Sequence, residues 1–250
     1  MSQCERSALQ DARVYLEWIR RQGLLVPRDE LEAAMASGAS SPGGAGAQDA
    51  SGLPSAPAGS SSPQAPARFA ALRAEVEACR KCALGYQRKN AVFGVGNPKA
   101  RLVFIGEAPG ATEDEQGKPF VGAAGNLLTR ELKKHGVERD EVFICNILKC
   151  RPPDNRDPLP EEIAACEPYL LEQLRLIGPQ MLCGLGRFAV MTLLKRQITI
   201  TKIRGTWEHY EGLPLFVCLH PAAVLHQPVN RPLFEADIKT LCEAYKRGAP

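Results

Sequence analysis

Short apolar runs alternate with amphipathic stretches from about residue 67 onward. The continuous runs predict strands that are buried on both faces of a sheet, at residues 101–106, 141–146, 180–186 and 213–221. Between them, apolar residues recur every three or four positions and predict helices, at residues 67–82, 124–136, 161–178, 187–196 and 231–247. This alternation predicts an α/β chain with a three-layer αβα fold, in which helices flank a central, mostly parallel sheet.

The N-terminal part of the chain has a different pattern. Residues 10–23 fit a short amphipathic helix within an N-terminal appendage, residues 1–35. Residues 36–67 consist mainly of Ser, Gly, Pro and Ala, which bury too little apolar surface to offset the entropy of ordering, so we expect a disordered linker. The folded domain then covers residues 68–250. The short helix can dock on this domain or on an unknown protein partner, and the sequence leaves both open.

Composition and charge narrow the class of protein. No run approaches the roughly 20 apolar residues of a membrane helix. Charged residues interrupt the N-terminus where a signal peptide would be apolar, so we expect a cytoplasmic protein without a membrane partner. The net charge is +3, and residues 1–67 hold five Lys and Arg against seven Asp and Glu, which leaves +5 for the rest. This mild bias favours an anionic partner.

Four of the nine cysteines stand apart by their spacing. Cys79 and Cys82 form a C-x2-C pair, and Cys150 and Cys166 lie far along the chain. In a reducing compartment such residues are thiols or metal ligands, and four thiolates can hold a structural zinc ion or an iron–sulfur cluster. The wide second spacing favours the cluster, because zinc ribbons usually have two close pairs. The alternative is that all nine are plain thiols, as we expect for the other five, Cys4, Cys145, Cys183, Cys218 and Cys242.

Chemically capable residues follow the predicted strands at their carboxyl ends, where parallel sheets bind ligands. The turn at residues 106–110 can aim backbone N–H groups at a ligand. Asn146 ends the next strand, and its amide can read a base edge that carries both a donor and an acceptor. His220 follows the last strand, and a neutral imidazole can donate to an oxygen that gains negative charge. Phe120 can stack on a flat ligand or plug the core. Together these residues predict a pocket for a flat ring.

Several long motifs occur in a fixed order: GEAPGATEDEQGKPFVGAAGNLL, NILKCRPPDNRDPLPEEIAACEPYL, LGRFA, IRGTW and HPAAVL. In these motifs the chain resembles the family 4 uracil-DNA glycosylases, the iron–sulfur type found in bacteria and archaea, from about Phe69 to Lys246. The resemblance implies a DNA repair hydrolase that flips uracil out of DNA, breaks its N-glycosidic bond and leaves an abasic site. We expect a monomer that acts on uracil-containing DNA.

The resemblance also implies roles for single residues. It implies a [4Fe–4S] cluster whose ligands are Cys79, Cys82, Cys150 and Cys166. It implies a uracil pocket formed by Gly106, Glu107, Ala108, Phe120, Asn146 and His220. In that pocket Phe120 stacks on the base, Asn146 reads N3–H and O4, and His220 lies beside O2. It implies that residues 221–226 form a loop that enters the duplex, through Val224, Leu225 and His226.

The residue that activates water stays open. Many uracil glycosylases use an aspartate, and the resemblance puts Ala108 at that place. The candidates are Glu107, Glu113 and Asn155, of which Glu107 is favoured for orienting the pocket and Glu113 is the next candidate, for the water. The alternative for residues 113–115 is a solvated helix start that complements the helix dipole.

The sequence departs from the family pattern in two places, and two rival functions stay open. Leu225 is followed by His226, where the family usually has a permanently charged arginine. No histidine lies between Arg151 and Cys166, so we do not expect the covalent capture of the sugar that a related branch performs. The rival functions are a glycosylase for another deaminated base, such as hypoxanthine, and a non-catalytic, metal-stapled nucleic-acid binder.

Overall fold

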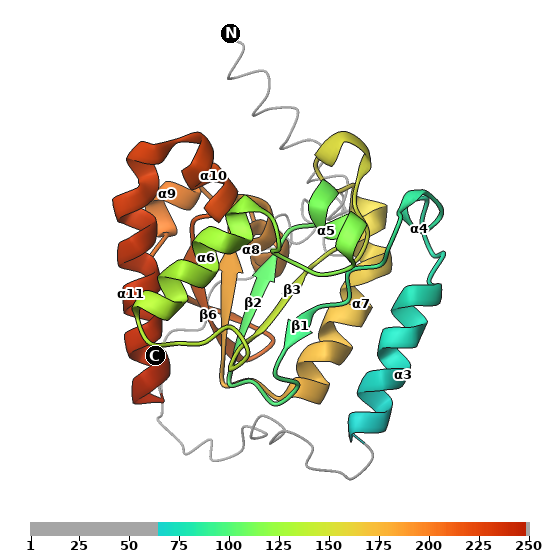
Figure 1. Ribbon diagram of the computed structural model, residues 1–250, viewed down its shortest axis with the longest axis horizontal. Helices are drawn as coiled ribbons and strands as arrows, with labels where there is room; N and C mark the ends of the chain where they lie inside the picture. The colour runs from blue at the N-terminus through green and yellow to red at the C-terminus, as the bar shows by residue number, and fades with distance from the viewer. Residues whose placement is uncertain (1–64, 249–250) are drawn as a thin grey trace, which may run out of the picture. The chain divides into compact units, whose positions relative to one another are not determined.

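A six-stranded sheet forms the centre of the computed structural model, which describes residues 65–248 (Figure 1). The strand order is β1-β3-β2-β4-β6-β5. The four inner strands are parallel to one another, and β1 and β5 pair antiparallel with β3 and β6 at the two edges. The strands are β1 (Val95–Gly96), β2 (Leu102–Gly106), β3 (Phe143–Asn146), β4 (Met181–Leu185), β5 (Trp207–Tyr210) and β6 (Leu213–Cys218).

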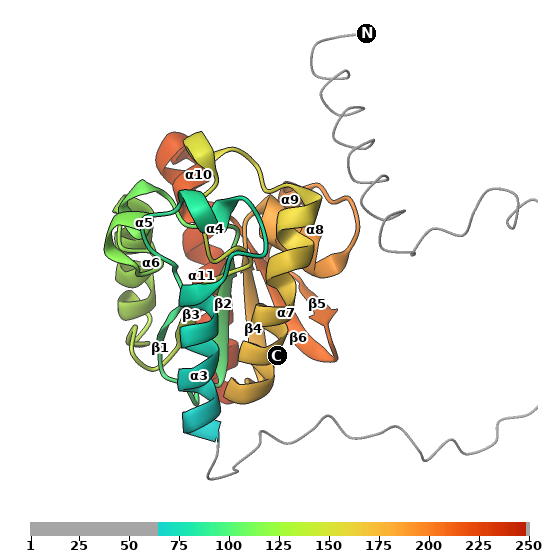
Figure 2. The ribbon, with the colours of Figure 1, turned by 90° about the vertical axis from the view of Figure 1, so that its right-hand side faces the viewer.

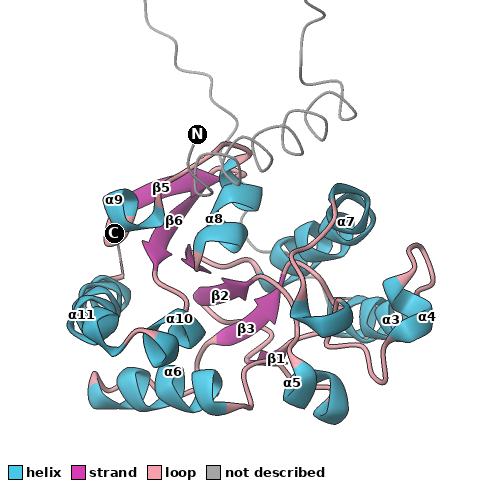
Figure 3. Ribbon diagram, turned by 90° about the horizontal axis from the view of Figure 1, so that it is seen from above, coloured by secondary structure: helices cyan, strands magenta, loops and turns pink. Residues whose placement is uncertain are grey.

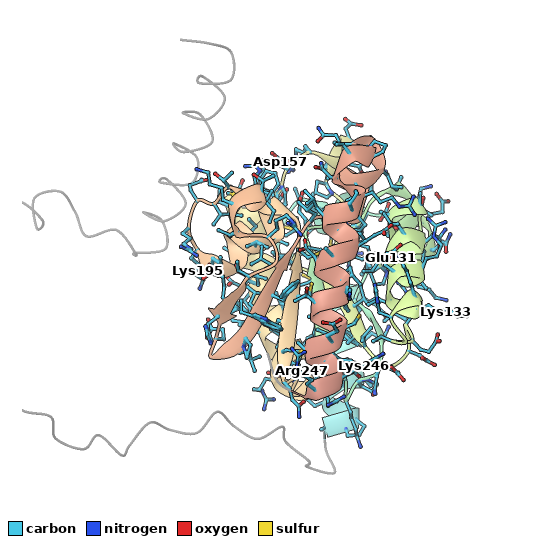
Figure 4. All side chains as sticks on the ribbon, turned by 90° about the vertical axis from the view of Figure 1, so that its left-hand side faces the viewer. Glu131, Lys133, Asp157, Lys195, Lys246 and Arg247 are labelled. Carbon is cyan, nitrogen blue, oxygen red and sulfur yellow. The ribbon has the colours of Figure 1, made fainter. Side chains whose placement is uncertain are left out.

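Helices cover both faces of the sheet (Figure 3). One face carries α3 and α7, which pack against each other, and the other carries α6 and α11 (Figure 2). Figure 4 looks onto α11, which runs alongside α6. The helices are α3 (Ala65–Ala78), α4 (Leu84–Gln87), α5 (Ala111–Gln116), α6 (Ala123–Lys134), α7 (Pro160–Ile177), α8 (Arg187–Leu194), α9 (Ile200–Ile203), α10 (Pro221–His226) and α11 (Arg231–Arg247), with 3-10 turns η1 (Pro153–Asn155) and η2 (Pro228–Asn230).

Strand β2 shows why the apolar runs become inner strands. All five of its residues are buried. Val103 and Ile105 lie in the core under α3 and α7, whereas Leu102 and Phe104 lie in the core under α6 and α11. Because successive side chains of a strand point to opposite faces, a strand between two helical layers must be apolar at every position. The predicted αβα fold is confirmed.

The structure corrects three local predictions. Residues 221–226, predicted as a loop, form helix α10, since Pro221 stands at the first helical position and His220 caps it. The helix predicted over residues 67–82 ends at Ala78, so the C-x2-C pair lies in the following loop and not in the helix. The helix predicted over residues 187–196 ends at Leu194, where Lys195 adopts a left-handed conformation.

The predictions for residues 1–64 lie outside the described residues, including the short helix at residues 10–23 and most of the linker. Between residues 65 and 248, no helix has both the length and the apolar character needed to span a membrane.

Candidate active site and cysteine cluster

The carboxyl ends of β2, β3 and β6 meet at a cavity of about 370 Å³. Its wall includes the residue predicted to read the edge of the base and the residues predicted to act as acids or bases. These residues come from four separate segments of the chain. The lining residues are Glu107, Ala108, Pro109, Gly110, Glu113, Phe120, Ala124, Asn146, Pro152, Asn155, Arg156, His220, Ala222 and His226. The structure therefore brings together the predicted catalytic residues and all the predicted base-binding residues except Gly106, which lies directly behind two of them.

Gly106 lets Asn146 and Phe120 approach each other closely. It is the last residue of β2 and pairs with Asn146 in the parallel register. A Cβ atom on Gly106 would stand 2.4 Å from Asn146 Oδ1 and 2.8 Å from the Phe120 ring. Because real Cβ contacts are longer than this, any side chain at position 106 would displace the amide or the ring.

Phe120 is held in an uncommon backbone conformation. Its φ angle is 51°, in the left-handed region that bulky residues rarely adopt. Its ring is only 7% exposed and lies 5.6 Å from the His220 ring, centroid to centroid. Glu113 fixes the loop that follows, because Glu113 Oε1 accepts hydrogen bonds from the backbone N–H groups of Val121 and Gly122, both at 3.0 Å.

Asn146 presents an acceptor without a protein partner. The residue is 1% exposed, and its Oδ1 atom has no hydrogen-bond donor among the described residues. Its backbone carbonyl accepts a hydrogen bond from Lys149 Nζ at 2.6 Å. A buried polar atom without a partner is costly, and such atoms in a pocket wall are suited to a donor on a ligand.

His220 has its tautomer set by the start of α10. The backbone N–H of Ala222 donates to His220 Nδ1 at 3.1 Å, so in the neutral ring Nε2 carries the proton. Burial lowers the pKa of His220 to about 4, against a smaller opposing effect of the Glu113 charge. The imidazole is therefore neutral at physiological pH and can donate from Nε2.

The four acidic residues of the first motif have different environments. Burial raises the pKa of Glu107 to about 7, aided by repulsion from Asp157 (Figure 4) and opposed by Arg187. Asp114 is 5% exposed and accepts hydrogen bonds from the backbone of the segment before β1, so the alternative of a solvated helix start is wrong for this residue. Glu115 is exposed and forms an ion pair with a surface lysine, as a solvated helix residue does.

The remaining predicted residues lie at the rim of the pocket or beside it. Asn155 is exposed on η1, and its Oδ1 accepts a hydrogen bond from Arg151 Nε at 2.8 Å. Leu225 is 43% exposed on α10, and His226 lines the pocket. Val224 is 2% exposed and packs in the core under α6 and α11, so the structure presents Leu225 and His226 to the outside but not Val224.

The four cysteines with the distinctive spacing line one small cavity between α3, α4 and α7. The loop after α3 contributes Cys79 and Cys82, the segment after β3 contributes Cys150, and α7 contributes Cys166. Arg88 Nη1 donates to the sulfur of Cys150 at 2.9 Å. Four convergent sulfur atoms with an adjacent cation match the donor set of a thiolate-ligated iron–sulfur cluster.

The four cysteines, as placed in the structure, do not form a site for one metal ion. Within residues 65–248, no three His, Cys, Asp or Glu side chains are grouped to hold a single metal ion. Burial raises the pKa of the Cys166 thiol to about 12, and a bound metal would reverse this by favouring the thiolate.

Sequence reasoning missed several residues of both sites. Arg156 lines the pocket and forms an ion pair with Glu162 of α7, which fixes the rim segment to that helix. Arg88 and Lys149 line the cysteine cavity. Clustering of basic residues around the cysteine motifs was the available signal for these two, but surface lysine and arginine residues are too common for it to be specific.

Fold and site together define a DNA-glycosylase-like α/β protein, and comparison with known proteins makes this specific. The family model of the uracil DNA glycosylase superfamily matches residues 93–242, and the chain belongs to that superfamily. A type-4 uracil-DNA glycosylase of Sulfurisphaera tokodaii is 46% identical over 181 residues, which cover 69% of this chain and 82% of that protein.

Other relatives fix the branch of the superfamily. A type-4 enzyme of Archaeoglobus fulgidus is 45% identical, covering 70% of this chain and 92% of its own length. A type-5 uracil-DNA glycosylase of Pyrobaculum aerophilum is only 29% identical, over 62% of this chain and 73% of its own length. The chain is therefore a member of the type-4 uracil-DNA glycosylases, as its motifs predicted.

Proposed function

We propose that this chain is a DNA repair glycosylase that removes uracil from DNA by hydrolysing its N-glycosidic bond, which leaves an abasic site. The observation that carries this proposal is the buried, unpartnered Oδ1 of Asn146 in the wall of a pocket that also contains Phe120 and His220. A base inside a duplex cannot reach such a pocket, so the nucleotide must rotate out of the stack. Leu225, exposed on α10 next to the pocket-lining His226, is suited to fill the vacated space.

Base recognition follows from the complementary edges of the amide and the base. The N3–H group of uracil donates to Asn146 Oδ1, and uracil O4 accepts from the amide nitrogen. Cytosine has no N3–H, and it has an amino donor in place of O4. Binding cytosine would therefore leave buried polar groups unpaired, which is the strongest form of discrimination that a small pocket can provide.

Bond cleavage needs stabilisation of the departing uracil and of the sugar. When the bond breaks, negative charge accumulates on the base, and the neutral His220 can donate from Nε2 to uracil O2. Glu113 already uses one oxygen to hold the loop around Phe120, so we assign it the ordering of the pocket. Glu107 has no such backbone partner among the described residues and is the better candidate to hold water and to balance the positive sugar.

We further propose that Cys79, Cys82, Cys150 and Cys166 hold a [4Fe–4S] cluster. Their convergence in one cavity and their type-4 relatives support this proposal. When bound, the cluster would supply a rigid cross-link between distant segments, and no step of base excision passes through it. The residues around it would hold the loop after α3 against α7.

The function is tested with single- and double-stranded oligonucleotides that contain one uracil, hypoxanthine or cytosine. We expect excision of uracil alone, detected as alkali-sensitive strands. Preferential excision of hypoxanthine would identify a glycosylase for another deaminated base. Binding of DNA without release of any base would identify a nucleic-acid binder.

The pH dependence of excision tests the assignment of Glu107. With a pKa of about 7, Glu107 is protonated at lower pH and cannot assist water. Single-turnover rates should therefore rise roughly tenfold per pH unit up to about pH 7 and then level off. The variant Glu107→Gln should be slower and should lack this limb.

Two controls separate catalysis from stability. Burial raises the pKa of Glu107 from 4.5 to about 7, so the folded state binds this proton more tightly than the unfolded state does. The stability that the protonated Glu107 contributes is therefore fully present below pH 4.5 and is lost as the pH rises through about 7. The melting temperature at each pH shows whether the enzyme stays folded over the measured range. If the excision rate of Glu107→Gln still rises with pH up to about pH 7 as in the wild type, the titrating group is a residue other than Glu107.

A further inference from the structure

Lys149 is a buried cation between the base-reading strand and the cysteine cavity. It follows Asn146 by three positions and directly precedes Cys150. Its side chain is among the largest that are fully buried, with a relative exposure of 1%. Lys149 lines the cavity of the four cysteines, and its backbone N–H donates to the sulfur of Cys166 at 3.2 Å.

The charge of Lys149 lacks a counterion within residues 65–248. None of the ion pairs formed between these residues includes Lys149. Its Nζ donates to one protein acceptor, the carbonyl oxygen of Asn146. An ammonium group carries three donors. Burial of an unpaired charge costs several kcal/mol, so buried lysines are normally paired.

Arg88, the other cation beside the cysteine sulfurs, differs in this respect. Its guanidinium donates to the sulfur of Cys150 and to the backbone carbonyls of Val76, Glu77 and Cys79. It is also only partly buried. Its donors are thus satisfied by the protein, whereas those of Lys149 are satisfied only in part.

The cysteine cavity itself can supply the missing charge. Four thiolates outweigh the positive charge of an iron–sulfur core, so a ligated cluster is an anion. Lys149 lines the same cavity as the four cysteines, and its backbone N–H already donates to one of their sulfur atoms, that of Cys166. An anion in this cavity would therefore lie within electrostatic reach of the ammonium group.

We propose that Lys149 is the counterion of the cluster and, through its hydrogen bond to the Asn146 carbonyl, a positioning residue for base reading. This inference rests on the cluster assigned above. Lys149 does not touch the base. Lys149 connects the cluster to the end of β3, where the Asn146 amide reads the base. The cluster, although remote from the bond that breaks, thereby contributes to the geometry of the pocket.

Two substitutions separate the charge of Lys149 from its hydrogen bond. Lys149→Met removes both, whereas Lys149→Gln removes the charge and keeps an N–H donor. Gln173→Met is the matched control, because Gln173 is also fully buried on α7 and also donates to a backbone carbonyl, that of Phe93 at 2.8 Å. Gln173 is not among the residues that line the cysteine cavity.

The first measurements follow the cluster itself. We expect both Lys149 variants to lose iron to a chelator about 10- to 100-fold faster than the wild type and to show a more negative midpoint potential, because loss of a nearby positive charge disfavours the reduced cluster. Gln173→Met should match the wild type in both. The second measurement follows excision, where Lys149→Met should raise KM for a uracil oligonucleotide more than it lowers kcat.

The outcomes distinguish this inference from the cluster assignment. A wild-type protein without iron would overturn the assignment of the cluster. An iron-loaded wild type with an unchanged potential in Lys149→Gln would overturn the counterion role, as would equally fast iron loss in Gln173→Met. An unchanged KM in Lys149→Met would overturn the positioning role. Circular dichroism confirms folding, and Lys149→Gln remains usable for the cluster measurements if Lys149→Met does not fold.

Discussion

Uracil excision by the Asn146→Asp variant is expected to fall by about 100-fold or more, because a buried carboxylate faces uracil O4 where the amide nitrogen donated. Asn146 is 1% exposed, so a charge at this position would be almost completely desolvated. The same change should narrow the preference for uracil over cytosine. A carboxyl group that takes up a proton can donate to N3 of cytosine and accept from its amino group.

Single-turnover kcat and KM on oligonucleotides with one uracil or one mispaired cytosine measure both effects. Asn230→Asp is the matched control, since it makes the same chemical change at a half-buried residue of η2 that does not line the pocket. Asn230→Asp should behave as the wild type. An Asn146→Asp variant with unchanged rate and unchanged preference would remove Asn146 from base reading.

The inner strands could be predicted because burial on both faces leaves a continuous apolar run in the sequence. Strands β1 and β5 were missed for the converse reason. β1 has two half-buried residues, and β5 has one buried residue out of four. Edge strands of this kind depend on pairing with a neighbour, as β5 does with β6, and such pairing leaves little local signal.

The strand-end residues could be predicted because parallel strands end at one edge of a sheet. Asn146 and His220 are far apart in the chain, yet both line the cavity. What Glu113 does could not be predicted, because its contacts depend on how the loop around Phe120 folds back. In the structure this carboxylate binds two backbone N–H groups, which its position in a run of acidic residues does not indicate.

Lys149 illustrates a different limit of sequence reasoning. A lysine next to a cysteine motif is typical of a solvated surface, and only the three-dimensional arrangement shows that this one is buried. Val224 illustrates the same limit. Within a presumed loop it is available to enter DNA, but helix α10 turns it into the core and leaves Leu225 exposed.

His220→Ala is expected to lower kcat by about 100- to 1,000-fold with a smaller change in KM, because the Nε2 donor acts mainly on charge that develops as uracil leaves. His220 is neutral, since burial holds its pKa at about 4, so the acceleration comes from a hydrogen bond and not from an imidazolium. The rate of the wild type should therefore show no decline between about pH 7 and pH 9, where a catalytic imidazolium would lose its proton.

A partial rescue distinguishes donation from packing against Phe120. His220→Asn restores a side-chain N–H in a smaller group and should recover part of the loss, whereas His220→Phe keeps the ring without a donor and should recover none. His209→Ala is the matched control, because His209 lies exposed on β5 and does not line the pocket. Equal rates for His220→Phe and the wild type would show that the ring contributes shape alone. In that case the backbone N–H groups of the turn after β2 would have to stabilise the departing base.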